Sequence, residues 1–180
     1  MREQEQKFIE EALPQLQPYL LSDELYWSLG SNLPRLTPGN LLLSLKRLEA
    51  VNPLLTERER LKLESLQTRW RIAWEKKIIR EMTSRLRSWL QFLEEQARDE
   101  APSRAHYAAS VRERAILQLL QPTWPPLTEA DLFLRARFRP GAFVWEAVYQ
   151  PVFPESEFWF LYGSLQRKEV LNDSSRTTGT

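Results

Sequence analysis

The chain has no cysteine, one histidine and five glycines among its 180 residues. Without cysteine there is no disulfide, no thiolate nucleophile and no thiolate-bound zinc or iron–sulfur cluster. The single histidine, His106, excludes every metal site that needs two imidazole ligands. The small number of glycines disfavours glycine-rich phosphate loops and sheets with many tight turns.

The sequence also lacks long apolar runs and a net charge of either sign. No apolar stretch approaches the roughly 20 residues that a membrane-spanning helix needs, and residues 1–17 are polar and mixed in charge, unlike a secretory signal. Lys and Arg number 25 against 24 Asp and Glu, so no global field draws the molecule to nucleic acid or an anionic membrane. We therefore expect a cytoplasmic protein without a membrane span.

The usual catalytic motifs are missing as well. The sequence contains no Gly-x-Ser-x-Gly elbow, no phosphate-binding or dinucleotide loop and no calcium loop. Adjacent carboxylates such as Glu94 and Glu95 point about 100° apart on a helix and do not converge. We expect no catalytic residue, no metal and no cofactor. An enzyme with a carboxylate site assembled from distant residues is kept as a third alternative for the function.

Twelve prolines punctuate long, glycine-poor segments in which apolar residues recur every three or four positions. This pattern predicts a mainly α protein, an irregular bundle of about five or six helices with an aromatic-rich C-terminal portion. We predict a single helical domain over residues 1–167, with a weak sub-boundary at the proline-rich segment 121–127. The small, polar residues 168–180 are predicted to form a disordered tail.

One predicted helix is unusually long. Residues 56–98 contain neither proline nor glycine, and Thr56 with Glu59 fits the capping box that opens a helix. An unbroken helix of this length would extend roughly 60 Å at 1.5 Å per residue, further than a small globular protein is wide. It must therefore protrude, pair with another chain or break.

Residues 132–149 fit two structures. The sequence from Thr128 to Asp131 can cap a helix that continues through Phe138, and this helix is favoured. The alternative is a β-hairpin that turns at Pro140 and Gly141.

A basic stripe is the first candidate site. On a helix with 100° between residues, six cationic side chains of the long helix fall within a sector of about 40°. They are Arg58, Lys62, Arg69, Lys76, Arg80 and Arg87. Such a stripe can lie along a phosphate backbone, an acidic partner helix or an anionic lipid surface. It can also be the solvated face that any amphipathic helix presents opposite its core.

Aromatic residues supply the second candidate site. The chain has seven tryptophans, and large rings either fill gaps between short elements or form an exposed anchor for another protein. The candidates for a partner interface are Trp70, Trp74, Trp145, Trp159 and Tyr162.

These features rank the functions. We expect a non-catalytic helical interaction or scaffold protein that docks on a protein partner or associates with itself. The alternative is an anion-associated helical protein that uses the basic stripe on an acidic partner or on nucleic acid, although the near-zero net charge does not favour nucleic acid. Binding that falls steeply with rising salt would favour this alternative.

Overall fold

The computed structural model describes residues 2–30, 32–98 and 103–166, and it is mainly α, as predicted. Its longer helices are α1 (Arg2–Leu21), α2 (Pro38–Val51), α3 (Pro53–Arg69), α4 (Arg71–Arg98), α5 (Arg104–Leu120) and α6 (Pro125–Arg135). The C-terminal portion contains strand β1 (Phe138–Phe143), 3₁₀ helix η1 (Ala147–Val152), α7 (Glu155–Phe158), 3₁₀ helix η2 (Trp159–Leu161) and strand β2 (Tyr162–Leu165). The predicted disordered tail at 168–180 lies outside the described residues.

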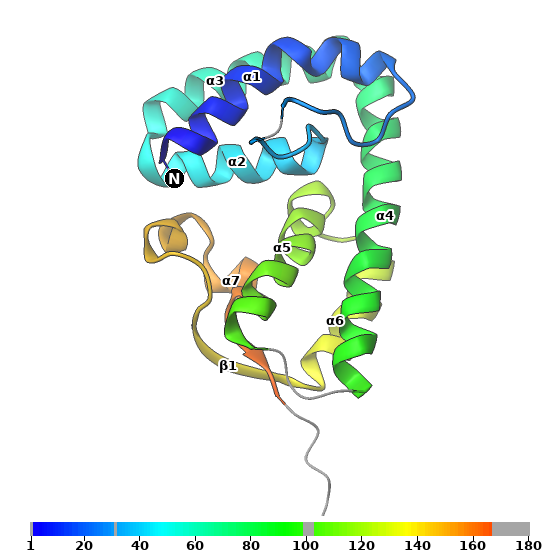
Figure 1. Ribbon diagram of the computed structural model, residues 1–180, viewed down its shortest axis with the longest axis vertical. Coiled ribbons are helices and arrows are strands. Elements are labelled where there is room, and N and C mark those ends of the chain that lie inside the picture. The colour runs from blue at the N-terminus through cyan, green and yellow to red at the C-terminus, as the bar shows by residue number, and fades with distance from the viewer. Residues whose placement is uncertain (1, 31, 99–102, 167–180) are drawn as a thin grey trace, which may run out of the picture.

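Helix α2 is central to the packing, because it contacts α1, α3, α4, α5 and η1. Figure 1 shows α1, α2 and α3 side by side in one layer, with α4 running from that layer along one side of the molecule. Helix α5 packs against both α2 and α4. In this view β1 lies below α5, and η1 packs against α2. None of the described helices has the length and apolar character needed to cross a membrane.

Two groups of buried apolar side chains hold this arrangement together. The first lies among α1, α2, α3 and the start of α4 and includes Phe8, Leu16 and Tyr19. The second lies among α4, α5, α6 and the C-terminal portion. Leu42 and Ile78 pack against both groups, so the two cores are continuous through α2 and α4.

The long segment breaks at Trp70, which is one of the three outcomes its length allowed. Trp70 has φ −115° and ψ 32°, and it separates α3 from α4. Each half can then turn its apolar face to the core, whereas a straight helix would carry one half into solvent. The predicted capping box at Thr56 is wrong, because Asn52 caps α3 and Thr56 lies inside it, donating to the Asn52 carbonyl at 2.9 Å.

Residues 132–149 form neither the full helix nor the hairpin. Helix α6 ends at Arg135, short of Phe138, and β1 pairs antiparallel with β2 in the register Phe138 to Leu165 and Phe143 to Tyr162. Gly141 therefore lies within a strand and not at a turn. The hairpin prediction is wrong because the true partner strand follows about 20 residues later, and a local turn pattern carries no information about it.

Candidate functional site

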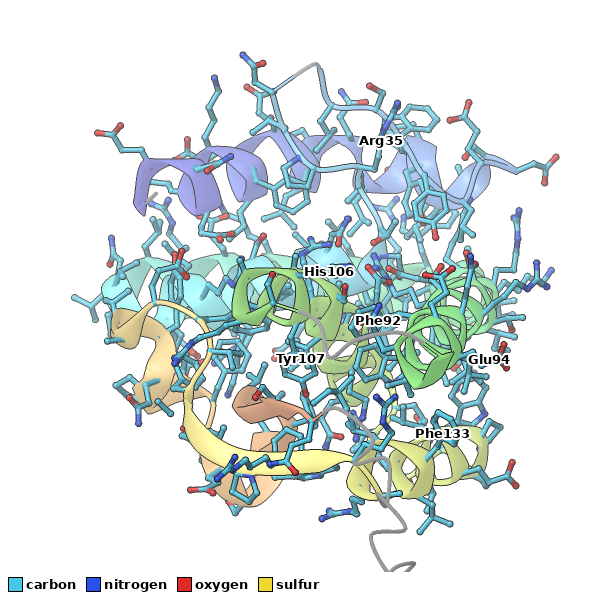
Figure 2. All side chains as sticks on the ribbon, turned by 60° about the horizontal axis from the view of Figure 1, so that its bottom comes forward. Arg35, Phe92, Glu94, His106, Tyr107 and Phe133 are labelled. Carbon is cyan, nitrogen blue, oxygen red and sulfur yellow. The ribbon has the colours of Figure 1, made fainter. Side chains whose placement is uncertain are left out.

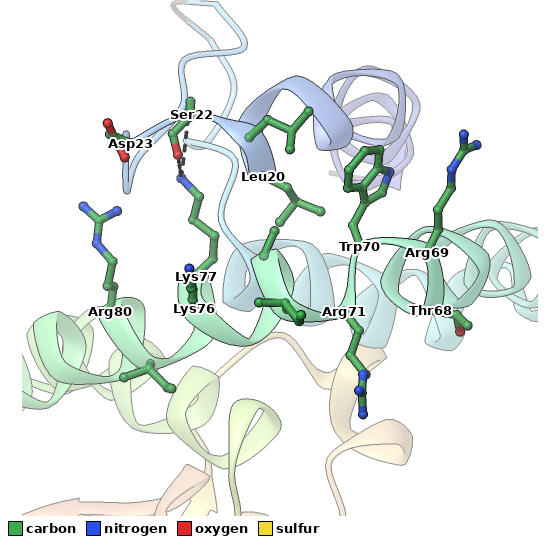
Figure 3. Close-up of a pocket in the computed structure, with 14 residues that line it drawn as sticks. Leu20, Ser22, Asp23, Thr68, Arg69, Trp70, Arg71, Lys76, Lys77 and Arg80 are labelled. Atoms are coloured by element: carbon green, nitrogen blue, oxygen red, sulfur yellow. Dashed lines mark hydrogen bonds between the residues drawn. The ribbon is translucent and has the colours of Figure 1, made fainter.

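A surface hollow of about 830 Å³ lies where the end of α1, the end of α3 and the first turns of α4 meet. We call it the corner hollow (Figure 3). The break at Trp70 creates it, because the chain changes direction there and the Trp70 ring lines the hollow. A continuous helix would present a convex surface at this place.

The wall of the corner hollow includes large apolar side chains that the fold leaves in solvent. The exposed fractions are 59% for Leu21, 66% for Ile72 and 64% for Ile79. Single exposed apolar residues are common, but three that line one hollow form the kind of patch found where another molecule binds.

The other residues that line the corner hollow are largely cationic. Arg69, Arg71, Lys76 and Arg80 line it, and in the described part of the chain none of them has a carboxylate within 4.0 Å. Figure 3 shows Arg69 and Arg80 pointing to the same side at the two ends of the hollow, whereas Arg71 points the other way. Among the described residues that line it, Asp23 is the sole acid.

Lys77 also lines the corner hollow, but its ammonium makes contacts within the protein. Its ammonium donates to the Ser22 carbonyl at 2.8 Å and to the Glu24 carbonyl, and it lies 4.4 Å from the centre of the Tyr19 ring. Burial lowers the pKa of Lys77, as does the charge of Arg80, while Asp23 and Glu24 oppose the shift. Lys77 therefore holds the segment after α1 against α4 and fixes one wall of the hollow.

The predicted basic stripe is divided by the break in the helix. Arg69, Lys76 and Arg80 gather at the corner hollow. Arg58 and Lys62, on α3, both bind the buried carboxylate of Glu59, at 2.8 Å each. Arg87 lies further along α4, beside a separate small hollow. The structure thus joins the middle of the stripe to an apolar surface and pairs its first part with one buried carboxylate.

We expect Glu59→Gln to lower the free energy of unfolding by about 1 kcal/mol at neutral pH. Burial raises the pKa of Glu59, but the hydrogen bonds and charges of Lys62 and Arg58 outweigh it, so the net pKa is lowered. A lowered pKa stabilises the fold above the ordinary carboxylate range, and this stabilisation disappears as the pH falls through the folded-state pKa. Thermal melts of the variant and the parent should therefore differ at pH 7 and converge as the pH falls below the ordinary carboxylate range.

Glu64→Gln is the matched control for this prediction, since Glu64 is an exposed carboxylate on the same helix. Its melting temperature should follow that of the parent at both pH values. A Glu59→Gln deficit that persists unchanged at pH 3 would contradict the ionic origin of the effect.

The predicted aromatic anchors do not form one surface. Trp70 lines the corner hollow, whereas Trp74 is buried in the first core. Trp145 donates to the Ala108 carbonyl at 2.8 Å and lies under Arg47, Trp159 lies under Arg135, and Tyr162 donates to the Phe153 carbonyl at 2.8 Å. Apart from Trp70, these rings connect elements within the fold.

A buried polar network is the feature that sequence reasoning missed. Glu81, with no exposed surface, accepts hydrogen bonds from the Thr37 hydroxyl at 2.5 Å, the Gly39 amide at 2.8 Å and Arg85 Nε at 2.7 Å. Arg85 also binds Glu113 at 2.7 Å. The network ties the start of α2 to α4 and α5. Its sequence signal is the four-residue spacing of Glu81 and Arg85 in a stretch of α4 that also contains two core positions, Met82 and Trp89.

No group of three or more His, Asp or Glu side chains within residues 2–30, 32–98 and 103–166 is placed to hold a metal ion. Together the fold and the corner hollow define a mainly α protein with an apolar, cation-lined surface site. Comparisons with protein-family models, with curated proteins and with solved structures found no match.

Proposed function

We propose that this protein is a partner-binding helical module, and that the corner hollow docks an acidic, amphipathic segment of another protein. The observation that carries the proposal is the placement of Leu21, Ile72 and Ile79, each more than half exposed, beside cationic side chains that have no acidic partner in the part of the chain that the structure describes. An amphipathic helix can bury its apolar face in such a groove while its carboxylates meet the arginines and lysines at the edge.

Size and charge both support this occupant. A volume of about 830 Å³ accommodates several side chains of a docked helix. The cations Arg69, Lys76 and Arg80, which have no carboxylate within 4.0 Å among the described residues, disfavour a basic partner, because bringing like charges together costs free energy. The exposed apolar area distinguishes this surface from a simple anion-binding face.

The test uses a labelled helical peptide with leucine at positions i, i+3, i+4 and i+7 and glutamate elsewhere. Fluorescence anisotropy should show saturable binding by the parent. A scrambled peptide of the same composition and a lysine analogue should bind at least tenfold more weakly. The double variant Arg69→Glu with Arg80→Glu should weaken binding at least tenfold, because two attractive charge pairs become repulsive. Ile72→Ser with Ile79→Ser should weaken it similarly through lost apolar contact.

Matched controls lie on the same molecule. Arg87→Glu makes the same charge change on α4 outside the corner hollow, and Leu132→Ser removes an apolar side chain that is 67% exposed on α6. Both should keep the parent affinity within about twofold. Equal losses in controls and test variants would contradict the proposal.

A second candidate, an anion-associated protein, rests on the same unpaired cations. It predicts that the scrambled acidic peptide and duplex DNA bind as tightly as the amphipathic peptide, with affinity falling steeply as salt rises. Self-association is the third outcome. Light scattering would show it as a dimer that persists in high salt and is lost in the Ile72→Ser, Ile79→Ser variant.

A further inference from the structure

A second hollow, of about 510 Å³, lies on a different face, between the α1–α2 loop, α4 and α5. We call it the arginine hollow because three arginines line it: Arg35 from the loop, Arg85 from α4 and Arg112 from α5. Ser88, Ser110 and Tyr26 add hydroxyl groups to its lining. Its lining thus supplies many hydrogen-bond donors around a space of the size that small ligands occupy.

The positive charge in this hollow is only partly neutralised. Arg85 is held by Glu81 and by Glu113, at 2.7 Å each. Arg112 has no carboxylate within 4.0 Å in the described part of the chain. Its guanidinium donates to Asn40 Oδ1 at 2.7 Å, an atom that also accepts from Arg85 at 3.0 Å. Arg112 is therefore a partly buried cation whose partner is neutral and shared.

Holding Arg112 in this place costs stability. Burial, followed by the charges of Arg85 and Arg47, lowers its pKa to about 10, against the opposing charges of Glu113 and Glu5. It remains charged at neutral pH, so the fold carries the desolvation and repulsion of this cation throughout the physiological range. A group that destabilises the empty fold and faces a hollow is a candidate ligand-binding group.

Asn40 links the two parts of the chain that carry Arg35 and Arg112. Its side-chain amide donates to the Arg35 carbonyl at 2.7 Å while its Oδ1 accepts from Arg112. This one side chain, itself buried at the start of α2, connects the loop that carries Arg35 to the guanidinium of Arg112. The Arg112 guanidinium and the backbone that carries Arg35 are thereby held before any ligand arrives, which reduces the entropy lost on binding.

We propose that the arginine hollow binds a small phosphate-bearing molecule, with Arg112 and Arg35 as the principal donors to the phosphate oxygens. Guanidinium groups match the geometry of phosphate oxygens in paired hydrogen bonds. The hollow is larger than a phosphate group alone, and Phe92 (Figure 2) and Tyr26 line it, so a ring or apolar portion of the ligand has a surface to contact. Glu113 also lines the hollow, bound to Arg85. Its negative charge would repel the further phosphates of a long polyanion, so the hollow favours a small ligand.

The experiment measures binding of inorganic phosphate and of adenosine monophosphate by calorimetry, with thermal melts in parallel. The parent should bind both, and its melting temperature should rise with either ligand but not with chloride at equal ionic strength. Tighter binding of the nucleotide would show that the natural ligand carries a ring, and equal affinities would point to free phosphate. Arg112→Gln should weaken phosphate binding about 10- to 100-fold and should melt at a temperature equal to or above that of the empty parent.

Arg87→Gln, the same charge change on α4 outside the hollow, should bind phosphate like the parent. Ser110→Leu narrows the hollow and keeps all three arginines, so it should also weaken binding and decides the matter if Arg112→Gln fails to fold. The proposal is overturned if phosphate raises the melting temperature of all variants equally, if chloride has the same effect, or if Ser110→Leu binds phosphate like the parent.

Discussion

Replacing Glu81 with glutamine is expected to lower the free energy of unfolding by about 3 to 5 kcal/mol. Glu81 has no exposed surface and accepts hydrogen bonds from Thr37, Gly39 and Arg85. Glutamine would set an amide N–H against one of these donors and would leave the buried Arg85 with Glu113 as its sole anion. For a domain of this size the melting temperature should fall by roughly 10 °C.

A double-mutant cycle tests whether the Glu81–Arg85 pair is the cause. Arg85→Met alone should also be strongly destabilising, because it leaves the Glu81 carboxylate buried without a counter-charge. Together, Glu81→Gln and Arg85→Met should cost clearly less than the sum of the two single changes. Glu94→Gln, an exposed carboxylate on the same helix, serves as the control and should be neutral. Strict additivity of the two single changes would show that the pair is not coupled.

Gly39→Ala is the second change with a large expected effect, a loss of about 3 kcal/mol. In an ordinary helical position alanine would stabilise relative to glycine by roughly 0.5 to 1 kcal/mol. Here an added Cβ would overlap Ile116 Cγ2 and come within 2.7 Å of Glu81 Oε1. Neither neighbour can move away, because Ile116 is fully buried and the Glu81 carboxylate is fixed by its hydrogen bonds.

Gly141→Ala is the matched control, since a Cβ there would meet only the Gly163 Cα at an ordinary 3.7 Å. Chemical denaturation of the two variants should separate them by about 3 kcal/mol. A stable Gly39→Ala protein would mean that α2 can shift away from α4 and α5, and the network argument would fail with it.

The helices themselves could be predicted from local signals. Thr37 followed by Pro38 marks the start of α2, where the Thr37 hydroxyl accepts the Asn40 amide at 3.0 Å. Signals of this kind depend on neighbours within one turn, which the sequence displays directly. The strand pairing of β1 with β2 depends on a segment remote in the chain, so the local turn pattern at Pro140 and Gly141 was misleading.

The sequence predicted several residues of the candidate site, but not how they come together in space. Helical periodicity identified Arg69, Lys76 and Arg80 as one cationic face and Trp70 as an aromatic candidate. The convergence of these residues with Leu21 depends on the break at Trp70, because a straight helix would have kept the end of α1 away from them. Whether a charged residue is paired also depends on distant segments, as Arg112 and Asn40 illustrate across 72 positions.

The sequence by itself therefore determined the fold class, the approximate extents of most helices and the chemical character of each helix face. These follow from the free energy of burying apolar stripes and capping helix ends, which are local properties of the chain. Tertiary structure alone decided where the long segment breaks, which ions are paired or left unpaired, and which faces meet to form the two hollows. Those outcomes depend on packing between segments far apart in sequence, where a few residues such as Glu81 and Gly39 fix the contact through close approach that no local pattern encodes.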